Sequence, residues 1–362
     1  MNKIKVLIVD DSAVIRSIVR ETLKLDELIE VVGEAEDPLV ARKLIKELNP
    51  DVITLDVEMP KMDGITFLKN LMRLRPIAVV MLSTLTTKGA EITIEALELG
   101  AIDFIAKPSV EDLIINRNSF KDTLLEKVRF AAEVDLKSYR LSHAINKVEG
   151  NRVLSFTGSK RTNHLIAIGA STGGTDAIKT VLSKLPNNSP PIVITLHIPK
   201  AFSGSFAKRL DTLCTVKVLE AQHGQKVKEG HVYIAPGDMH LKITAKGGSL
   251  FCQLEDSEEV NRHKPSVDVL FDSLSDIAAN VQAVLLTGMG QDGAQGMLNL
   301  KQQGAKTIIQ DQQTSLIWGM PGCAFRLNAH CEQYALVDVA KNILRFAALD
   351  RKSVKEVMYE YQ

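Results

Sequence analysis

Residues 5–12 read Lys-Val-Leu-Ile-Val-Asp-Asp-Ser, and this stretch decides the fold of the amino-terminal part of the chain. Its four apolar residues are too few for a buried helix and enough for a buried strand. The strand runs into two carboxylates and is followed by an amphipathic segment at residues 13–25. Because this alternation of strand and helix recurs along the chain, the sequence predicts βαβ units and a parallel sheet.

Five short apolar runs alternate with five helix-like segments in the first part of the chain. The predicted strands are Val6–Val9, Val31–Val32, Val52–Leu55, Ala78–Leu82 and Ile102–Ala106. The predicted helices are roughly Ala13–Leu25, Pro38–Leu48, Gly64–Leu74, Lys88–Leu99 and Lys121–Ala132. We therefore expect a first domain at residues 1–132.

After this domain the apolar pattern weakens and then resumes. Residues 133–163 are rich in polar residues and Gly, which is typical of a linker, and one further helix of the first domain is the alternative. A second series, expected to form a domain at residues 164–350, predicts strands at Leu165–Gly169, Ile192–Leu196, Val216–Leu219, His231–Ala235, Ala283–Thr287 and Thr307–Gln310. Its predicted helices are Ala201–Leu210, Ser266–Ala279, Gly293–Gln303 and Met320–Asn328.

The second domain is expected to be a doubly wound, mostly parallel α/β sheet with one antiparallel element. The segment Leu241–Leu254 alternates apolar and polar residues around Lys-Gly-Gly, which predicts a hairpin. We expect this hairpin to form an antiparallel edge of the sheet.

Composition narrows the class of protein. The 362 residues hold 44 Lys plus Arg and 44 Asp plus Glu, so the chain lacks the excess of basic charge typical of nucleic-acid binding. No apolar stretch approaches the ~18 residues of a membrane-spanning helix, so membrane insertion is not expected. The four cysteines show no CxxC or zinc spacing, which is typical of buried thiols in a reducing compartment. We expect a soluble, cytoplasmic protein.

Polar residues follow three of the predicted strands of the first domain. Asp10 and Asp11 follow the first strand, Asp56 follows the third, and Lys107 follows the fifth. If the first and third strands are neighbours, three carboxylates share one crevice at the carboxyl edge of the sheet. Such a group is unfavourable unless a cation lies among its members, and Mg²⁺ suits oxygen ligands of this kind. The alternative is that each Asp is a helix cap or turn residue.

This pocket has the groups needed for phosphoryl transfer to a carboxylate. An Asp beside Mg²⁺ with a lysine ammonium facing it is a plausible nucleophile, because the cations neutralise charge on the transferring oxygens. Ser83 follows the fourth strand, and its hydroxyl could donate to a phosphoryl oxygen.

The motifs of residues 1–130 resemble the receiver domain of response regulators. They are Val-Asp-Asp-Ser at 9–12, Leu-Asp-Val-Glu-Met-Pro-Lys-Met-Asp-Gly at 55–64, Ser83, and Gly-Ala-Ile-Asp-Phe-Ile-Ala-Lys-Pro at 100–108. The resemblance implies a flavodoxin-like (βα)5 fold in which a histidine kinase phosphorylates Asp56. It also implies that Asp11, Asp56 and the Glu58 carbonyl bind Mg²⁺, with Asp10 acting through a water. Ser83 and Lys107 would hold the phosphoryl group, and Phe104 would reposition on activation.

In the second domain, the strand 165–169 leads into Gly169-Ala170-Ser171-Thr172-Gly173-Gly174 and then a helix. In this Gly-x-Ser-x-Gly arrangement a sharp turn exposes the serine hydroxyl at a helix N-terminus, where N–H groups can stabilise an oxyanion. The same residues could instead form a phosphate-binding loop.

A serine nucleophile needs a base and an orienting carboxylate. His197 directly follows the strand Ile192–Leu196, while His240 and His263 lie in loops near polar motifs. Asp292 follows the strand that ends near Thr287. Ser171, His197 and Asp292 thus follow parallel strands that end at one edge, which is the placement that a triad requires. The chain order Ser, His, Asp differs from the Ser, Asp, His order of α/β-hydrolases, which argues against that fold.

The blocks around these residues resemble the chemotaxis protein-glutamate methylesterase family. They are Ile-Gly-Ala-Ser-Thr-Gly-Gly at 168–174, Leu-His-Ile-Pro at 196–199, Tyr-Ile-Ala-Pro-Gly-Asp at 233–238, Val-Asn-Arg-His-Lys-Pro-Ser-Val-Asp at 260–268 and Leu-Leu-Thr-Gly-Met-Gly-Gln-Asp-Gly at 285–293. The resemblance implies hydrolysis of γ-glutamyl methyl esters on chemoreceptors, deamidation of selected receptor glutamines, and no cofactor for the hydrolysis.

The same resemblance assigns roles in the second domain. Ser171 would be the nucleophile, His197 the base, Asp292 the orienting carboxylate and the Met289 backbone N–H an oxyanion donor, with Arg262 and His263 near the site. Our hypothesis for joining the two domains is that the unphosphorylated receiver covers the cleft and that phosphorylation of Asp56 weakens this interface. The rival hypotheses are a non-enzymatic receptor-binding regulator and a dinucleotide-dependent enzyme, and the latter is weakened because the Gly-x-Gly-x-x-Gly spacing is missing.

Overall fold

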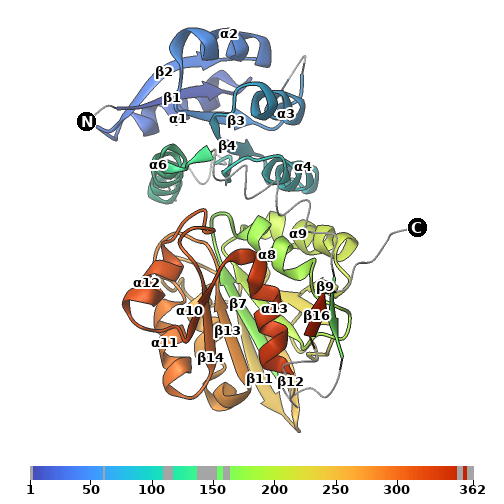
Figure 1. Ribbon diagram of the computed structural model, residues 1–362. Coiled ribbons are helices and arrows are strands. Elements are labelled where there is room, and N and C mark those ends of the chain that lie inside the picture. Colours follow the sequence, from blue (N-terminus) through green and yellow to red (C-terminus); the bar gives the residue numbers. More distant parts are fainter. Residues whose placement is uncertain are drawn as a thin grey trace. The chain divides into compact units, whose positions relative to one another are not determined.

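The computed structural model describes residues 3–59, 62–108, 117–136, 153–157, 164–348 and 354–356. The chain divides into two compact units, residues 1–141 and 142–362 (Figure 1). Most of the predicted linker, residues 137–152 and 158–163, lies outside the described residues. Its described part includes the short strand β6 (Leu154–Phe156), which pairs antiparallel with β16 (Val354–Glu356).

The first unit is a five-stranded parallel sheet with the strand order β2-β1-β3-β4-β5. Its strands are β1 (Ile4–Val9), β2 (Ile29–Ala35), β3 (Val52–Asp56), β4 (Ala78–Ser83) and β5 (Asp103–Ala106). Its helices are α1 (Ala13–Leu23), α2 (Pro38–Leu48), α3 (Gly64–Leu74), α4 (Thr87–Glu98) and α6 (Arg117–Glu133). The expected neighbours β1 and β3 do pair, so their carboxyl ends lie side by side.

Polar side chains cap four of the helices in the first unit. The side chains of Ser12, Asp37, Asp63 and Thr86 each accept a hydrogen bond from a backbone N–H in the first turn of the helix that follows. Such caps satisfy N–H groups that lack partners within the helix. The caps fix the residue at which each helix begins. The residues between the end of a strand and the cap are therefore not helical, and their side chains can contribute to a site.

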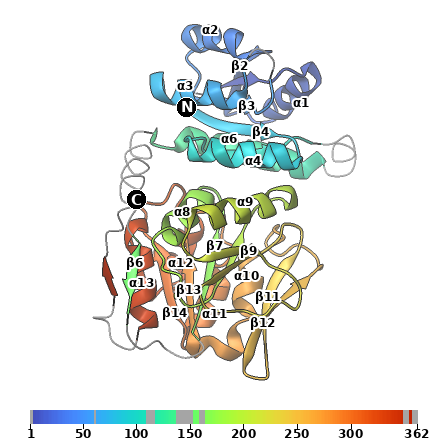
Figure 2. The same cartoon turned by 90° about the vertical axis from the view of Figure 1, so that its right-hand side faces the viewer.

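The second unit is built on a seven-stranded sheet in which every pairing is parallel, with the order β15-β14-β13-β7-β8-β10-β9 (Figures 1 and 2). Its strands are β7 (Leu165–Ala170), β8 (Ile192–Leu196), β9 (Lys217–Glu220), β10 (His231–Ile234), β13 (Val281–Leu285), β14 (Lys306–Gln310) and β15 (Glu332–Tyr334). Its helices are α8 (Gly174–Leu182), α9 (Lys200–Leu213), α10 (Val267–Asp272), η1 (Ser275–Asn280), α11 (Ala294–Gln302), α12 (Met320–Arg326) and α13 (Leu336–Ala347).

The predicted hairpin is present as β11 (His240–Lys246) and β12 (Ser249–Glu255), but its expected place at the sheet edge is wrong. The two strands form a sheet of their own. The hairpin buries Leu241, Ile243 and Cys252 in the cluster that also holds α10. The outer edge of β12 is occupied, because the N–H groups of Gly224 and Val227 donate to the carbonyls of Cys252 and Leu250, and the Cys252 N–H donates to the Gln225 carbonyl. The hairpin therefore pairs with residues 224–227 and packs on α10 instead of joining the main sheet.

The predicted helix Ser266–Ala279 is broken into α10 and the 3₁₀ helix η1. Ser273 lies at the break, where its hydroxyl donates to the Leu270 carbonyl and accepts from the Ile243 N–H of the hairpin. A serine that bonds to the preceding turn in this way competes with continued helix. The break lets α10 pack under β11 while η1 leads into β13.

The position of the site follows from the strand order. Along the chain, β7 is followed by strands on one side of it and later by β13 on its other side, so the order reverses between β7 and β13. Ligands of open α/β sheets bind beyond the carboxyl ends of the strands at such a reversal. None of the helices among the described residues is long and apolar enough to cross a membrane.

Candidate functional sites

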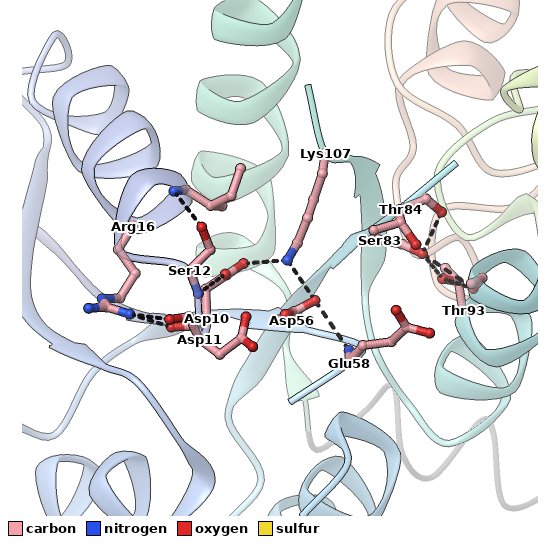
Figure 3. A network of polar contacts seen from close by, with 12 residues as sticks. Asp10, Asp11, Ser12, Arg16, Asp56, Glu58, Ser83, Thr84, Thr93 and Lys107 are labelled. Carbon is pink, nitrogen blue, oxygen red and sulfur yellow. Dashed lines mark hydrogen bonds and ion pairs between the residues drawn. The ribbon is translucent and has the colours of Figure 1, made fainter. Parts of the chain in front are cut away.

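In the first unit, the strand ends bring three of the predicted residues into direct contact. Asp10 and Asp56 are 0% and 2% exposed, and Lys107 Nζ lies 2.8 Å from Asp10 Oδ2 and 2.9 Å from Asp56 Oδ1. Figure 3 shows Lys107 reaching between the two carboxylates. A buried lysine that bridges two buried carboxylates compensates much of their charge.

The same pocket can hold a divalent cation. One carboxylate oxygen from each of Asp10, Asp11 and Asp56 lies within 4.8 Å of the other two. These hard oxygen donors fit Mg²⁺, which typically takes one or two carboxylates and keeps several waters. The Glu58 backbone N–H donates to Asp56 Oδ1 at 3.3 Å, which fixes the backbone of Glu58 beside the pocket.

Charge in this pocket is poorly solvated. Burial and the neighbouring Asp10 raise the pKa of Asp56 to about 6, against the opposing effect of Lys107. Burial likewise raises the pKa of Asp10. Burial alone would lower the pKa of Lys107, but Asp10 and Asp56 outweigh it and raise that pKa. A bound cation would stabilise the ionised forms of these carboxylates, so the pocket is well suited to binding a metal ion.

Ser83 is buried at the end of β4 but does not contact these carboxylates. Its hydroxyl donates to the Gly89 carbonyl of α4 at 3.2 Å. It also accepts from Thr93 Oγ1 of the same helix at 2.7 Å (Figure 3). The predicted aromatic residue Phe104 is 7% exposed, with Lys127 Nζ 5.3 Å from its ring centroid. The structure therefore joins Ser83 to α4 rather than to Asp56.

In the second unit, Ser171 lies in a turn between β7 and α8. The Ser171 N–H donates to the Thr287 carbonyl after β13, and the Ser171 carbonyl accepts from the Gly174 N–H at 2.7 Å. Gly173, between them, has a φ of 75°, a left-handed conformation that favours glycine. A side chain at Gly288 would place its Cβ 2.8 Å from the Ser171 Cβ. The serine is thus held at the strand-order reversal by backbone from two neighbouring strands.

Ser171, His197 and Asp292 form one hydrogen-bonded chain. His197 Nδ1 lies 3.1 Å from Ser171 Oγ, and His197 Nε2 lies 2.8 Å from Asp292 Oδ2. In the serine-protease triad the serine faces Nε2 and the aspartate faces Nδ1, so the ring here is used in the opposite sense. With the proton on Nε2, Nδ1 has its lone pair toward the serine. The chain can therefore transfer a proton from Ser171 to His197.

Asp292 is surrounded by donors. Apart from His197, it accepts from Asn261 Nδ2 at 2.8 Å, from Ser266 Oγ at 2.7 Å and from the backbone N–H groups of Val267 and Asp268. Burial would raise the pKa of Asp292, but His197, Asn261 and Ser266 outweigh it and hold the pKa well below its usual range. These donors therefore favour the ionised carboxylate beside the imidazole.

Met289 belongs to the loop that faces Ser171. On one side of it, the Gly288 N–H donates to the Ile317 carbonyl and the Gly288 carbonyl accepts from the Met320 N–H. On its other side, Gly290 has a φ of 82°. Within the described part of the chain, the Met289 N–H has no acceptor. An N–H without an acceptor, in a loop whose Gly288 borders Ser171, is a candidate oxyanion donor.

Comparisons with known proteins bear on both units. A family model described as CheB methylesterase matches residues 166–343, and one described as response regulator receiver domain matches residues 6–118. A protein-glutamate methylesterase/protein-glutamine glutaminase of Saccharophagus degradans is 52% identical over 96% of this chain and 99% of its own length. The chain belongs to the CheB methylesterase family. It is a hydrolase of this family with a response-regulator receiver domain.

Two further relatives agree with this membership. The protein-glutamate methylesterase/protein-glutamine glutaminase of Hydrogenovibrio crunogenus is 48% identical over 95% of this chain and 99% of its own. The crystal structure of the CheB methylesterase catalytic domain of Thermotoga maritima is similar at 35% identity, with a TM-score of 0.50, and covers 52% of this chain and all of that one. The predicted fold, α/β with two parallel sheets and an antiparallel hairpin, is confirmed.

The two other candidate histidines of the second unit, hereafter the methylesterase unit, differ in their surroundings. His240 is fully buried, and its ring nitrogens contact the Glu258 carbonyl and the Ser266 N–H, so it braces the loop between β12 and α10. His263 stacks on His197, with ring centroids 3.6 Å apart. Arg262, next to it, is exposed.

Sequence reasoning missed three polar residues at the two sites. Arg16 donates to the carbonyls of Asp10 and Asp11 and ties the acidic pair to α1 (Figure 3). Asn261 donates to both Asp292 and Asp268, and Asp268 is a buried carboxyl whose pKa is raised to about 6 by burial and by Asp292. Two sequence features could have pointed to these residues: an Arg one turn into α1, and an Asn-x-x-x-x-Ser-x-Asp pattern that runs into the start of α10.

Two of the four free cysteines of the second unit, Cys214 and Cys252, are poor candidates for a nucleophile. Burial raises the pKa of both Cys214 and Cys252 to about 12, which keeps these thiols protonated near neutral pH. Trp318 donates its indole N–H to the Gln310 carbonyl and packs against Phe325, with ring centroids 5.4 Å apart. Ser171, which contacts His197, remains the nucleophile candidate at this edge.

Proposed function

We propose that this protein hydrolyses γ-glutamyl methyl esters on chemoreceptors, releases methanol, deamidates selected receptor glutamines, and does so faster when Asp56 is phosphorylated. The observation that carries the proposal is the hydrogen-bonded chain of Ser171, His197 and Asp292 at the strand-order reversal. It lies on the same chain as a carboxylate pocket of the receiver type. The names of the curated relatives support the choice of glutamate esters and glutamine amides as substrates.

The esterase reaction is derived from the contacts of Ser171. Ser171 Oγ attacks the ester carbonyl while its proton passes to His197 Nδ1, and Asp292 stabilises the imidazolium through the Nε2–H bond. The Met289 N–H donates to the oxyanion of the tetrahedral intermediate. Nδ1–H then protonates the departing methoxide, which leaves a glutamyl ester on Ser171. A water, deprotonated by the same Nδ1, hydrolyses this ester and restores the enzyme.

The deamidation of glutamine uses the same residues and differs only in the leaving group. The amide nitrogen takes the proton from His197 and departs as ammonia, and the second half of the reaction is unchanged. An amide leaves less readily than methoxide, so proton transfer from His197 matters more in this reaction. No step needs a metal or cofactor ligand in the catalytic unit.

In the receiver, Asp56 is the proposed phosphate acceptor and a histidine kinase the proposed donor. Asp10, Asp11, Asp56 and the Glu58 carbonyl would hold Mg²⁺, which supplies charge neutralisation on the transferring phosphoryl oxygens. Lys107, already bonded to Asp56, would remain on the phosphoryl group, and Ser83 would join it. For this step the Ser83 hydroxyl has to leave Gly89 and Thr93, which links the chemistry to α4.

The test is methanol release from membranes carrying methylated chemoreceptors, with and without Mg²⁺ and a small phosphodonor. We expect the wild-type rate to rise with the phosphodonor, since a coupling of 1–3 kcal/mol corresponds to roughly 5- to 150-fold. Asp56→Asn should keep the basal rate and lose the rise. Activation that survives in Asp56→Asn would remove the regulatory half, and the absence of methanol in all samples would remove the esterase half.

A further inference from the structure

A tight turn precedes α10 and brings two polar side chains to the triad. Val260 and His263 exchange backbone hydrogen bonds, with the Val260 N–H 3.1 Å from the His263 carbonyl and the His263 N–H 3.0 Å from the Val260 carbonyl. The two central residues, Asn261 and Arg262, have φ values of 55° and 67°. Two consecutive left-handed residues define a type I′ turn, which is unusual with Arg in the second position.

The first of these side chains is His263. Its imidazole lies face to face on that of His197, with ring centroids 3.6 Å apart and an interplanar angle of 17°. The His197 side chain is 7% exposed. One face of the proposed base is therefore covered by a second aromatic ring.

The second is Asn261. Its amide nitrogen donates one hydrogen to Asp292 Oδ1 at 2.8 Å and the other to Asp268 Oδ2 at 2.7 Å. Asp268 also accepts from the Gly296 N–H at 2.6 Å, so it is fixed from the side of α11. Asn261 is thus a bridge between the triad carboxylate and a second buried carboxyl.

We propose that the Val260–His263 turn positions the triad, with His263 holding the plane of the His197 ring and Asn261 holding Asp292 in place. This inference rests on the proposed roles of Ser171, His197 and Asp292. Neither His263 nor Asn261 is assigned a proton transfer. Their action on the reaction is exerted through the two triad members that they contact.

The stacking matters because His197 has to satisfy two partners with one ring orientation. Its bonds to Ser171 and Asp292 both lie in the imidazole plane, so a tilt of the ring weakens both at once. A ring stacked at 3.6 Å leaves no room for such a tilt toward that face. Small misplacements of a catalytic group can cost about 100-fold in rate, so a modest restraint has a large kinetic effect.

The Asn261 bridge matters because two buried carboxyls lie next to each other. Ionised groups of like sign repel in such a place, and a shared donor is the simplest way to hold both at a fixed spacing. An asparagine serves this purpose at a left-handed position, since it tolerates that backbone better than most residues. The same turn therefore explains both the backbone conformation and the side chain at residue 261.

The turn is braced from both ends, which fits an element that has to stay in place. The Glu258 carbonyl, before the turn, accepts from His240, and the Ser266 N–H, after it, donates to the other nitrogen of the same buried ring. Lys264 pairs with Asp256 at 2.8 Å across the base of the loop. Positions of this kind hold sparsely populated backbone angles only where the surroundings fix them.

The test for His263 compares one aromatic replacement, His263→Phe, with two aliphatic replacements, His263→Ala and His263→Leu. In the phosphorylated full-length protein, His263→Phe should stay within about threefold of the wild-type kcat for methanol release. His263→Ala and His263→Leu should lower kcat by about 10- to 100-fold with KM unchanged. His231→Ala is the matched control, because His231 also stacks on an aromatic residue, Tyr233, at the far end of the sheet. It should match the wild type.

These variants separate positioning from other roles. Equal activity of His263→Ala and wild type overturns the proposal, and so does a His263→Phe protein as slow as His263→Ala, because ring nitrogens would then be what matters. If His263→Ala does not fold, His263→Leu decides, since it fills similar space without a flat face. Thermal unfolding of each variant shows whether a loss of kcat exceeds a loss of folded protein.

Asn261→Gly tests the second half, because glycine keeps the left-handed backbone and removes only the amide. We expect kcat to fall by about tenfold with KM unchanged. Asn299→Ala removes a similar asparagine–carboxylate contact, Asn299 to Asp272, away from the triad, and should have no effect. A wild-type kcat in Asn261→Gly overturns this half. If Ser171→Ala retains full activity, it is the proposed function that fails rather than the positioning inference.

Discussion

Asp292→Asn is the substitution that most sharply tests how the triad works. It replaces one carboxylate oxygen by an NH₂ group, although the groups that contact this carboxylate are all hydrogen-bond donors. Oδ1 accepts three hydrogen bonds, from Asn261, Ser266 and the Asp268 N–H, whereas Oδ2 accepts from the Val267 N–H and from His197. The new NH₂ therefore costs least at the Oδ2 position, where it would face His197 Nε2.

An NH₂ group at that position reverses the tautomer of His197. Nε2 would have to accept rather than donate, so the imidazole proton moves to Nδ1, the atom 3.1 Å from Ser171 Oγ. Nδ1–H cannot take a proton from the serine. The equivalent change in the serine-protease triad lowers kcat by about 10⁴-fold through the same tautomer effect. We expect a similar loss here, which corresponds to about 5 kcal/mol in the activation barrier.

The assay is the kcat for methanol release by the phosphorylated full-length protein. Asp272→Asn is the matched control, because Asp272 also accepts from an asparagine but on the exposed side of α10, and it should keep wild-type activity. Thermal unfolding of both variants checks that they are folded at the assay temperature. A folded Asp292→Asn protein within about tenfold of the wild-type kcat would refute the tautomer argument.

Three further predictions follow from single contacts. Folding raises the pKa of Asp268 from 3.8 to about 6. The contribution of Asp268 to the stability of the fold is therefore fully present below pH 3.8 and is lost as pH rises through 6. Relative to Asp268→Asn, wild-type unfolding free energy should fall by about 3 kcal/mol over this window, as measured by denaturant unfolding at each pH. Gly288→Ala should lower kcat about 100-fold, because its Cβ would lie 2.8 Å from that of Ser171, and stability measured in parallel should fall by only about 1–3 kcal/mol. Thr93→Val should speed phosphorylation by a small phosphodonor about fivefold, since it frees the Ser83 hydroxyl of one buried hydrogen bond, and a slower initial rate would contradict this.

Much of both sites could be predicted because parallel strands end at one edge of a sheet. Asp10, Asp56 and Lys107 are far apart in the chain, yet each follows a buried strand, and the structure brings them into contact. The same reasoning applied to Ser171 and His197 gave a pair that the structure places 3.1 Å apart. Apolar runs mark strand ends well, and strand ends carry most of the chemistry in this fold.

What could not be predicted lies where the chain departs from regular periodicity. Asn261 reaches Asp292 through a left-handed turn, and no hydrophobic pattern marks such a turn when its residues are Asn and Arg. The hairpin was predicted but not its separation from the main sheet, because that depends on packing against α10. Ser83 was placed at the right strand end, whereas its bond to Thr93 depends on a side-chain rotamer.

The most direct test of the central claim is the methanol-release rate of Ser171→Ala beside wild type, on the same methylated receptor membranes with Mg²⁺ and phosphodonor. Removing the nucleophile of a serine triad lowers kcat by about 10⁶-fold in a well-studied example, so we expect no methanol above background from the variant. Thermal unfolding should be unchanged, because the Ser171 hydroxyl contacts only His197 among the described residues. A folded Ser171→Ala protein that releases methanol at the wild-type rate would show that the ester is cleaved elsewhere.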